Sequence, residues 1–137
     1  MTGQAVYGMT MALGALGQIH ISVTDLDRSV AFYRDVLELP LLFQVPDQSM
    51  AFFGAGDVRL YLGVPESPRF RTTVLVYFWV DDIEAEHARL TDRGVTFDSS
   101  PHVVHRDEDT ELWMSFFRDP DGHELVLMQE RPPVGEV

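Results

Sequence analysis

The sequence predicts an α+β fold of two tandem βαβββ modules, and two observations predict it. First, an Asp followed by a helical stripe of apolar residues occurs twice, after Val23 and after Val80. Second, each half of the chain closes with two short apolar runs around a Gly-containing turn, as in a β-hairpin. Such repetition marks a duplicated supersecondary unit. Packed together, the modules would form a curved mixed sheet around a cleft, with the helices outside.

The first module is predicted from its apolar spacing. Leu26, Val30, Tyr33 and Leu37 form one helical stripe, and Asp25 stands at the N-cap, so we expect a helix over residues 26–37. Alternating or continuous apolar runs predict strands on either side of that helix, at residues 15–23, 41–45, 50–53 and 58–63.

The second module repeats this order. Asp82 as N-cap and Gly94 as C-cap predict a helix over 83–93. A polar loop over 99–111 is expected to hold His102 and His105 in solvent. The strands are expected at residues 73–80, 95–98, 112–118 and 123–130.

These elements give one domain with short tails. The tails are expected at residues 1–14 and 132–137. The domain between them, residues 15–131, divides into module one at 15–63, a linker at 64–71 and module two at 72–131.

Composition excludes several kinds of chemistry. The formal net charge of −12 would repel nucleic acid. The chain has no Lys for a Schiff base and no Cys for a disulfide, a thiolate zinc site or a nucleophile. No apolar run reaches the ~20 residues of a membrane span, and no basic stretch at the start suggests a signal peptide, so we expect a cytoplasmic protein.

Two phrases carry a family resemblance. The phrase Val23-Thr24-Asp25-Leu26-Asp27-Arg28-Ser29-Val30-Ala31-Phe32-Tyr33-Arg34-Asp35-Val36-Leu37 and the turn Phe116-Phe117-Arg118-Asp119-Pro120-Asp121-Gly122 resemble those of the vicinal oxygen chelate superfamily, which includes glyoxalases, bleomycin-resistance proteins and extradiol dioxygenases. The resemblance implies a cleft that often holds a metal, bound by His on the first and fifth strands and Glu on the fourth and eighth. It does not imply one reaction, because this fold hosts many.

The metal positions of the family fall here on Gln18, Tyr61, Leu75 and Val126. Two of these side chains have no donor atom and the other two are poor ligands, so no cofactor is expected. A divalent metal held by His20 and Glu124 is an alternative that the sequence leaves open.

Polar residues appear two positions from the family's metal positions, where strand alternation keeps the same face. This places His20, Arg59, Tyr77 and Glu124 on the predicted cleft face. His20 and Glu124 are candidate catalytic residues, because a carboxylate beside an imidazole favours a general base. The opposing interpretation is a structural histidine with charged residues at strand ends.

Aromatic residues define a second candidate surface. An aromatic cleft suits a flat or apolar ligand, although several of these rings could instead be core. The candidate ligand-binding residues are Arg59, Tyr61, Tyr77, Trp79 and Trp113.

Two functions follow from these interpretations. The first is a bleomycin-resistance-like protein that binds a small apolar or aromatic molecule without the usual metal, and its acidic surface would suit a cationic compound. The alternative is an enzyme of isomerase, lyase or dioxygenase type that uses an atypical metal set or the His20/Glu124 pair. In either case a homodimer is expected, with neither nucleic acid nor a membrane as partner.

Overall fold

The computed structural model describes residues 12–133, in a chain that divides into two compact units at residues 1–72 and 73–137. Each unit contains one four-stranded mixed sheet and one α-helix. The α+β class and the two βαβββ modules predicted from the sequence are therefore confirmed.

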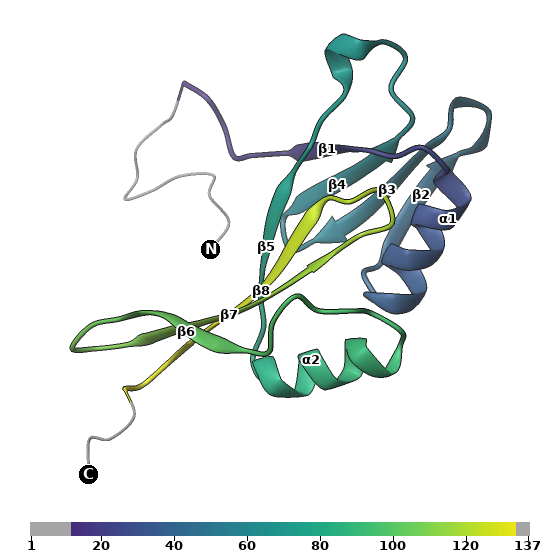
Figure 1. The fold of residues 1–137 in the computed structure, drawn as a ribbon. Helices are drawn as coiled ribbons and strands as arrows, with labels where there is room; N and C mark the ends of the chain where they lie inside the picture. The colour runs from purple at the N-terminus through teal and green to yellow at the C-terminus, as the bar shows by residue number, and fades with distance from the viewer. Residues whose placement is uncertain (1–11, 134–137) are drawn as a thin grey trace. The chain divides into compact units, whose positions relative to one another are not determined.

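The first unit forms a sheet with strand order β1-β4-β3-β2, in which only the β1–β4 pair is parallel (Figure 1). Its elements are β1 (Gln18–Ser22), α1 (Leu26–Ala31), the π-helical turn η1 (Phe32–Val36), β2 (Leu41–Val45), the 3₁₀ turn η2 (Pro46–Gln48), β3 (Met50–Ala55), β4 (Val58–Gly63) and the 3₁₀ turn η3 (Pro68–Phe70).

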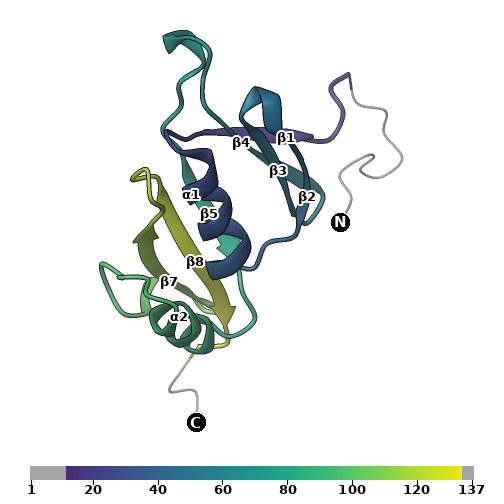
Figure 2. The ribbon, with the colours of Figure 1, turned by 90° about the vertical axis from the view of Figure 1, so that its right-hand side faces the viewer.

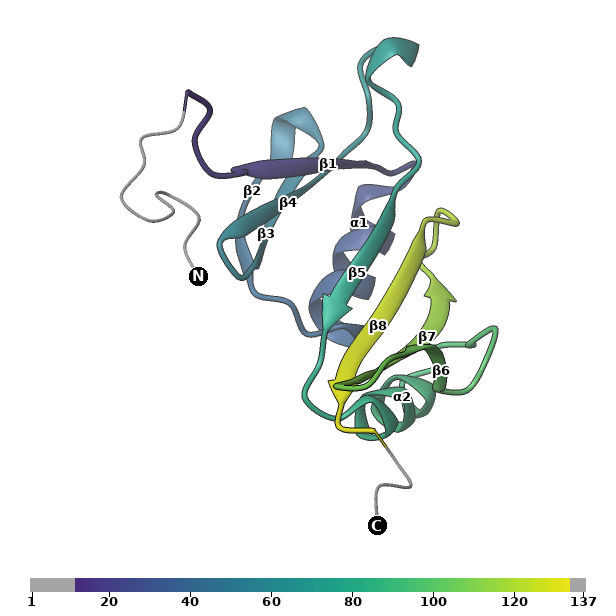
Figure 3. The same ribbon diagram turned by 90° about the vertical axis from the view of Figure 1, so that its left-hand side faces the viewer.

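The second unit repeats this topology as β5-β8-β7-β6, again with one parallel pair, β5–β8 (Figure 3). Its elements are β5 (Leu75–Trp79), α2 (Ile83–Asp92), β6 (His102–Arg106), β7 (Glu111–Arg118) and β8 (Glu124–Arg131).

Both helices begin where the sequence predicts. The Asp25 carboxylate accepts the Arg28 N–H at 3.2 Å, and the Asp82 carboxylate accepts the Ala85 N–H at 3.1 Å. The first helix widens into a π turn in which the Leu37 N–H donates to the Phe32 carbonyl. The helix predicted over 26–37 is thus present, but half of it is π-helical.

Each helix covers one face of its own sheet. α1 contacts β3 and β4, and α2 contacts β7 and β8 (Figure 2). In the first unit the residues that point to the helix side are fully buried, among them Ile21, Phe53 and Leu62. Because side chains alternate along a strand, the other face of the first sheet carries residues such as His20 and Tyr61. These two residues are paired across β1 and β4.

The sixth strand was predicted in the wrong place. Residues 95–98 form no strand, and Phe97 makes only an isolated bridge to Phe117. β6 lies instead at His102–Arg106, inside the stretch predicted as a polar loop, and pairs with β7. The polar composition of this stretch favoured a loop. Its two Val residues favour extended structure, and β7 completes the hydrogen bonds of the strand.

His102 and His105 are therefore strand residues that are exposed, rather than residues of a solvated loop. Within residues 12–133, neither α-helix has the length and apolarity needed to cross a bilayer.

We expect the Asp82→Ala substitution to destabilise the protein by about 1 kcal/mol, because the first turn of α2 loses its side-chain cap. The Asp81→Ala variant is the matched control, since it removes the same charge one residue earlier without touching the cap. Urea unfolding measures both. Equal loss of stability in the two variants would mean that charge, not capping, is responsible.

Candidate functional site

A row of four rings crosses the whole first sheet on the face away from α1. The rings belong to His20 on β1, Tyr61 on β4, Phe52 on β3 and Phe43 on β2, which are direct cross-strand partners. Successive ring centroids lie 4.6, 5.0 and 4.5 Å apart, and the two phenylalanine rings and Tyr61 are stacked. We call this set the ring row. The ring row forms one continuous line of aromatic side chains, and Phe52 is its buried member.

The position of Tyr61 depends on a glycine. A Cβ atom placed on Gly63 would lie 2.7 to 2.9 Å from the Tyr61 ring and hydroxyl, too close for any real contact. The ring therefore lies over the backbone of its own strand, above the point where a side chain at residue 63 would stand. Absence of a side chain at Gly63 is what lets Tyr61 lie there.

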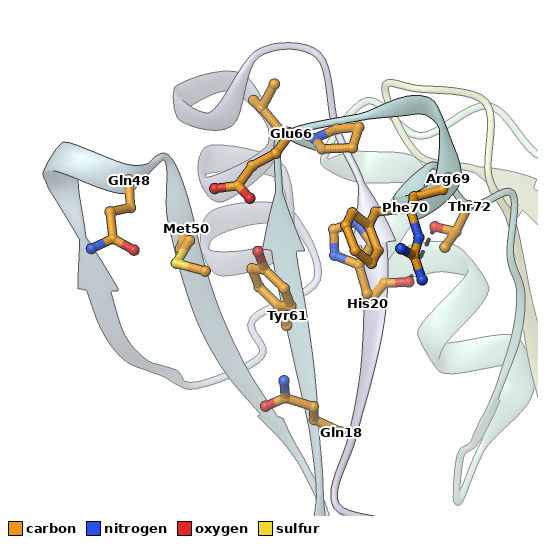
Figure 4. A pocket seen from close by; sticks show the side chains of 11 residues that line it. Gln18, His20, Gln48, Met50, Tyr61, Glu66, Arg69, Phe70 and Thr72 are labelled. Carbon is orange, nitrogen blue, oxygen red and sulfur yellow. Dashed lines mark hydrogen bonds between the residues drawn. The ribbon is translucent and has the colours of Figure 1, made fainter.

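Two members of the ring row, His20 and Tyr61, line a hollow of about 530 Å³, within the range of roughly 300–1,000 Å³ that small-molecule pockets occupy (Figure 4). One wall comes from β1, β3 and β4, through Gln18, His20, Met50 and Tyr61. The other wall comes from residues 64–72, which we call the return segment.

The return segment lines the hollow with several side chains and includes η3. These lining residues are Val64, Pro65, Glu66, Arg69, Phe70 and Thr72. Phe70 is half exposed, at 51 %, and so presents much of its ring to the surroundings.

A reciprocal pair of hydrogen bonds ties the end of the return segment to β1. The Ser22 N–H donates to Thr72 Oγ1 at 3.1 Å, and the Thr72 N–H donates to Ser22 Oγ at 2.8 Å. Thr72 Oγ1 also donates to the His20 carbonyl at 3.2 Å. Ser22 Oγ in turn lies 3.1 Å from His20 Nε2, so the same contacts orient the imidazole at the hollow.

Arg59 lies beside the ring row. Its guanidinium lies 5.0 Å from the Phe52 ring centroid and 5.7 Å from that of Phe43, and it donates to Gln18 Oε1 at 2.7 Å. These contacts hold Arg59 on the sheet surface by cation–π attraction and one hydrogen bond.

Tyr61 and Glu66 both line the hollow. Partial burial raises the pKa of the Tyr61 phenol above its usual value, and the negative charge of Glu66 raises it further. The phenol therefore stays protonated and can donate a hydrogen bond. Figure 4 shows the Glu66 carboxylate turned toward the Tyr61 hydroxyl.

The second unit carries the other predicted polar residues. Tyr77 and Trp79 are 44 % and 64 % exposed on the edge strand β5. Glu124 lies on the same face, level with Leu75, and its carboxylate accepts the Arg118 Nε–H at 2.8 Å. His20 belongs to the first unit, so its pairing with Glu124 stays a prediction.

Trp113 lies on the opposite face of the second sheet from Tyr77. Trp113 is paired with Gln129, whose side-chain oxygen accepts the Ile83 N–H at the start of α2. Tyr77 is level with Val126, three residues away along β8, and an odd step reverses the face. The register therefore separates Trp113 from Tyr77 and Trp79, and its role in ligand binding stays a prediction.

The surroundings of Trp113 are those of a structural residue. Its Nε1–H donates to Glu111 Oε1 at 3.2 Å, and the Arg131 guanidinium lies 4.4 Å from its ring centroid. Glu111 is fully buried and also accepts the Arg106 Nε–H at 2.8 Å. This network satisfies the indole N–H that the sequence left without a partner.

The residues at the family's metal positions do not fit a metal ion. Leu75 and Val126 have no donor atom, the Gln18 oxygen accepts from Arg59, and the raised pKa of Tyr61 opposes a phenolate ligand. Among residues 12–133, no group of three or more His, Asp or Glu side chains is placed to hold a metal.

Sequence reasoning missed the wall made by the return segment. Glu66, Arg69, Phe70 and Thr72 lie in a stretch that Pro65 and Pro68 mark only as a linker. Nothing in the local pattern says that this stretch folds back over β1 and β4, because the contacts that hold it there are distant in sequence.

The fold and these positions define a class of protein. The chain belongs to the Glyoxalase/Bleomycin resistance protein/Dioxygenase superfamily, whose profile matches residues 15–127. The resemblance of the two sequence phrases to this superfamily is thereby confirmed.

Individual relatives have diverse descriptions. An uncharacterised protein of Bacillus subtilis (strain 168), YraH, is 28 % identical over 125 residues, which is 80 % of this chain and 92 % of the relative. The crystal structure of TnmS3, an antibiotic binding protein from Streptomyces sp. CB03234, is 26 % identical with a TM-score of 0.69 and covers 90 % of this chain and 99 % of its own. A lactoylglutathione lyase from Agrobacterium tumefaciens shares the fold at 23 % identity, with a TM-score of 0.68 over 84 % of this chain and 92 % of its own.

We expect Gly63→Ala to destabilise the protein by about 1–3 kcal/mol, because the new methyl group must displace the Tyr61 ring. Gly54→Ala is the matched control on β3, since its Cβ would meet side chains only at 3.5 Å or more. Urea unfolding should show the loss for Gly63 alone, and most of it should disappear in a Tyr61→Ala background. A loss that survives in that background would show that Tyr61 is not the obstacle.

We expect the Tyr61 phenol to ionise above its ordinary pKa of about 10, since burial and Glu66 both oppose the phenolate. Because the folded-state pKa is the higher one, this group favours the folded state below the unfolded pKa, and the advantage is lost as pH rises through the folded pKa. Ultraviolet titration, with Tyr61→Phe subtracted, measures the value. In Glu66→Gln the pKa should fall but stay raised, because burial is the larger cause; an unchanged pKa would remove Glu66 from the account.

Proposed function

We propose that the chain is a binding protein for a small, flat, largely apolar molecule, and that the hollow of the first unit is its site. One observation carries the proposal. His20 and Tyr61 of the ring row lie on one wall of a hollow of about 530 Å³, and Phe70 lies on the other. Aromatic walls bind planar molecules by stacking and by removing apolar surface from water.

The polar groups of the hollow suit orientation of a ligand. The Gln18, Gln48 and Thr72 side chains are among its lining residues. A few polar groups among apolar walls are typical of ligand pockets. No step of the proposal needs a metal, because the metal positions lack the donors. The description of TnmS3 as an antibiotic binding protein agrees with a binding role in this superfamily.

A second candidate function is a small-molecule enzyme of isomerase, lyase or dioxygenase type. The observation that favours it is His20, which lines the hollow with its imidazole oriented by Ser22. An imidazole in that position could take a proton from a bound substrate. Glu124 as its acid–base partner, or as a co-ligand of a metal, remains part of this second proposal.

A homodimer remains a prediction. The exposed apolar side chains of Leu75, Tyr77 and Trp79 on the edge strand β5 are consistent with a surface that another chain covers.

The binding proposal is tested by calorimetry with the neutral flat probe 2-naphthylmethanol. Phe70→Ala should weaken binding by about tenfold, because one aromatic wall is lost. Val104→Ala, an exposed apolar truncation on β6, is the control and should leave the affinity unchanged.

Two results would contradict the proposal. One is absence of saturable binding of the probe. The other is an affinity that falls in Trp79→Ala and not in Phe70→Ala, which would move the ligand to the second unit.

A further inference from the structure

We propose that the hollow selects a planar ligand that carries a positive charge, and that the cation sits at the Tyr61 hydroxyl, beside the Glu66 carboxylate. This inference rests on the proposed binding function and names the class of its ligand: flat organic ammonium, amidinium or guanidinium compounds.

The protein already places one of its own cations on an aromatic ring of the hollow. The Arg69 guanidinium lies 4.8 Å from the Phe70 ring centroid, and both residues line the hollow. Ring faces are electron-rich and attract cations most strongly where water is partly excluded. An aromatic surface of the hollow therefore already holds a guanidinium group.

The described arginines leave Tyr61 without a cation. All ten arginines lie within residues 12–133, none of them lies over the Tyr61 ring, and the chain has no lysine. Tyr61 stacks between His20 and Phe52, so its ring faces are occupied, and its hydroxyl points toward Glu66 (Figure 4). A ligand that enters the hollow meets this hydroxyl beside the carboxylate.

Glu66 supplies the opposite charge. Within the described residues its carboxylate has neither a hydrogen bond nor an ion pair, although it lines the hollow and turns toward Tyr61 (Figure 4). Burial raises the pKa of the Tyr61 phenol, and the charge of Glu66 raises it further. A cation at the Tyr61 hydroxyl would thus meet the carboxylate as well, and charge-assisted hydrogen bonds are stronger than neutral ones.

Both positive charges near the hollow already have partners. Arg59 donates a hydrogen bond to Gln18 and lies over Phe52 and Phe43, and the Arg69 guanidinium lies over Phe70. The formal net charge of −12 adds a long-range attraction for cations.

The test is a charge series on one ring system, measured by calorimetry at low salt. The probes are 2-naphthylmethylammonium, 2-naphthylmethanol and 2-naphthylacetate. We expect the ammonium compound to bind about tenfold more tightly than the alcohol, and the carboxylate more weakly than both.

Variants assign the preference to Glu66. Glu66→Gln should remove the advantage of the ammonium over the alcohol, measured as the ratio of the two affinities in that variant. Asp57→Asn, in the β3–β4 turn, removes the same charge away from the hollow and should keep the advantage. Arg69→Gln should increase the affinity of the ammonium compound, because a repelling charge is removed.

The outcomes distinguish failure of the proposed charge preference from failure of the proposed binding function. Three outcomes overturn the inference while the binding function stands. They are equal affinities for the three probes, a higher affinity for the carboxylate, and an ammonium preference that survives Glu66→Gln. Failure of the alcohol to bind counts against the binding function itself.

Discussion

The contact between Tyr61 and Gly63 controls the geometry of the site. Tyr61 lies over its own strand because residue 63 has no Cβ, and its ring then stacks between His20 and Phe52. The ring row, one wall of the hollow and the environment of the Tyr61 hydroxyl all follow from that position. A larger residue at 63 would disturb each of them, because the ring has no second place on a close-packed sheet surface.

The second condition is the tie between the return segment and β1. Ser22 and Thr72 each donate a backbone N–H to the hydroxyl of the other. This fixes the end of a stretch whose only regular structure is a 3₁₀ turn. Without it, Phe70 and Glu66 would have no fixed position opposite Tyr61. The hollow is therefore formed by a sheet on one side and a tied loop on the other, a common arrangement for binding residues.

Features set by interactions between residues close in sequence could be predicted, and features set by residues distant in sequence could not. The capping aspartates and the apolar stripes are local, so both helices and most strands are found where expected. β6 was missed because its partner, β7, decides its conformation. The face of Trp113 could not be predicted, because it depends on the register of β7 with β8.

The candidate site shows the same division. His20, Tyr61 and Arg59 were predicted on one face because alternation within a strand is a local rule. Glu66 and Phe70 could not be predicted, since their place depends on a loop that returns to a distant strand. The duplicated fold explains the family membership, whereas the function depends on residues outside its repeated pattern.

The central claim is that the ligand lies against the ring row of the first unit. Nuclear Overhauser effects between bound 2-naphthylmethylammonium and the protein's methionine methyl groups test it most directly. Met50 lines the hollow, whereas Met114 and Met128 are partners in the second sheet. The account predicts effects from the naphthyl protons to Met50 and to the Tyr61 ring. Effects confined to Met114 and Met128 would contradict it and place the ligand on the second unit.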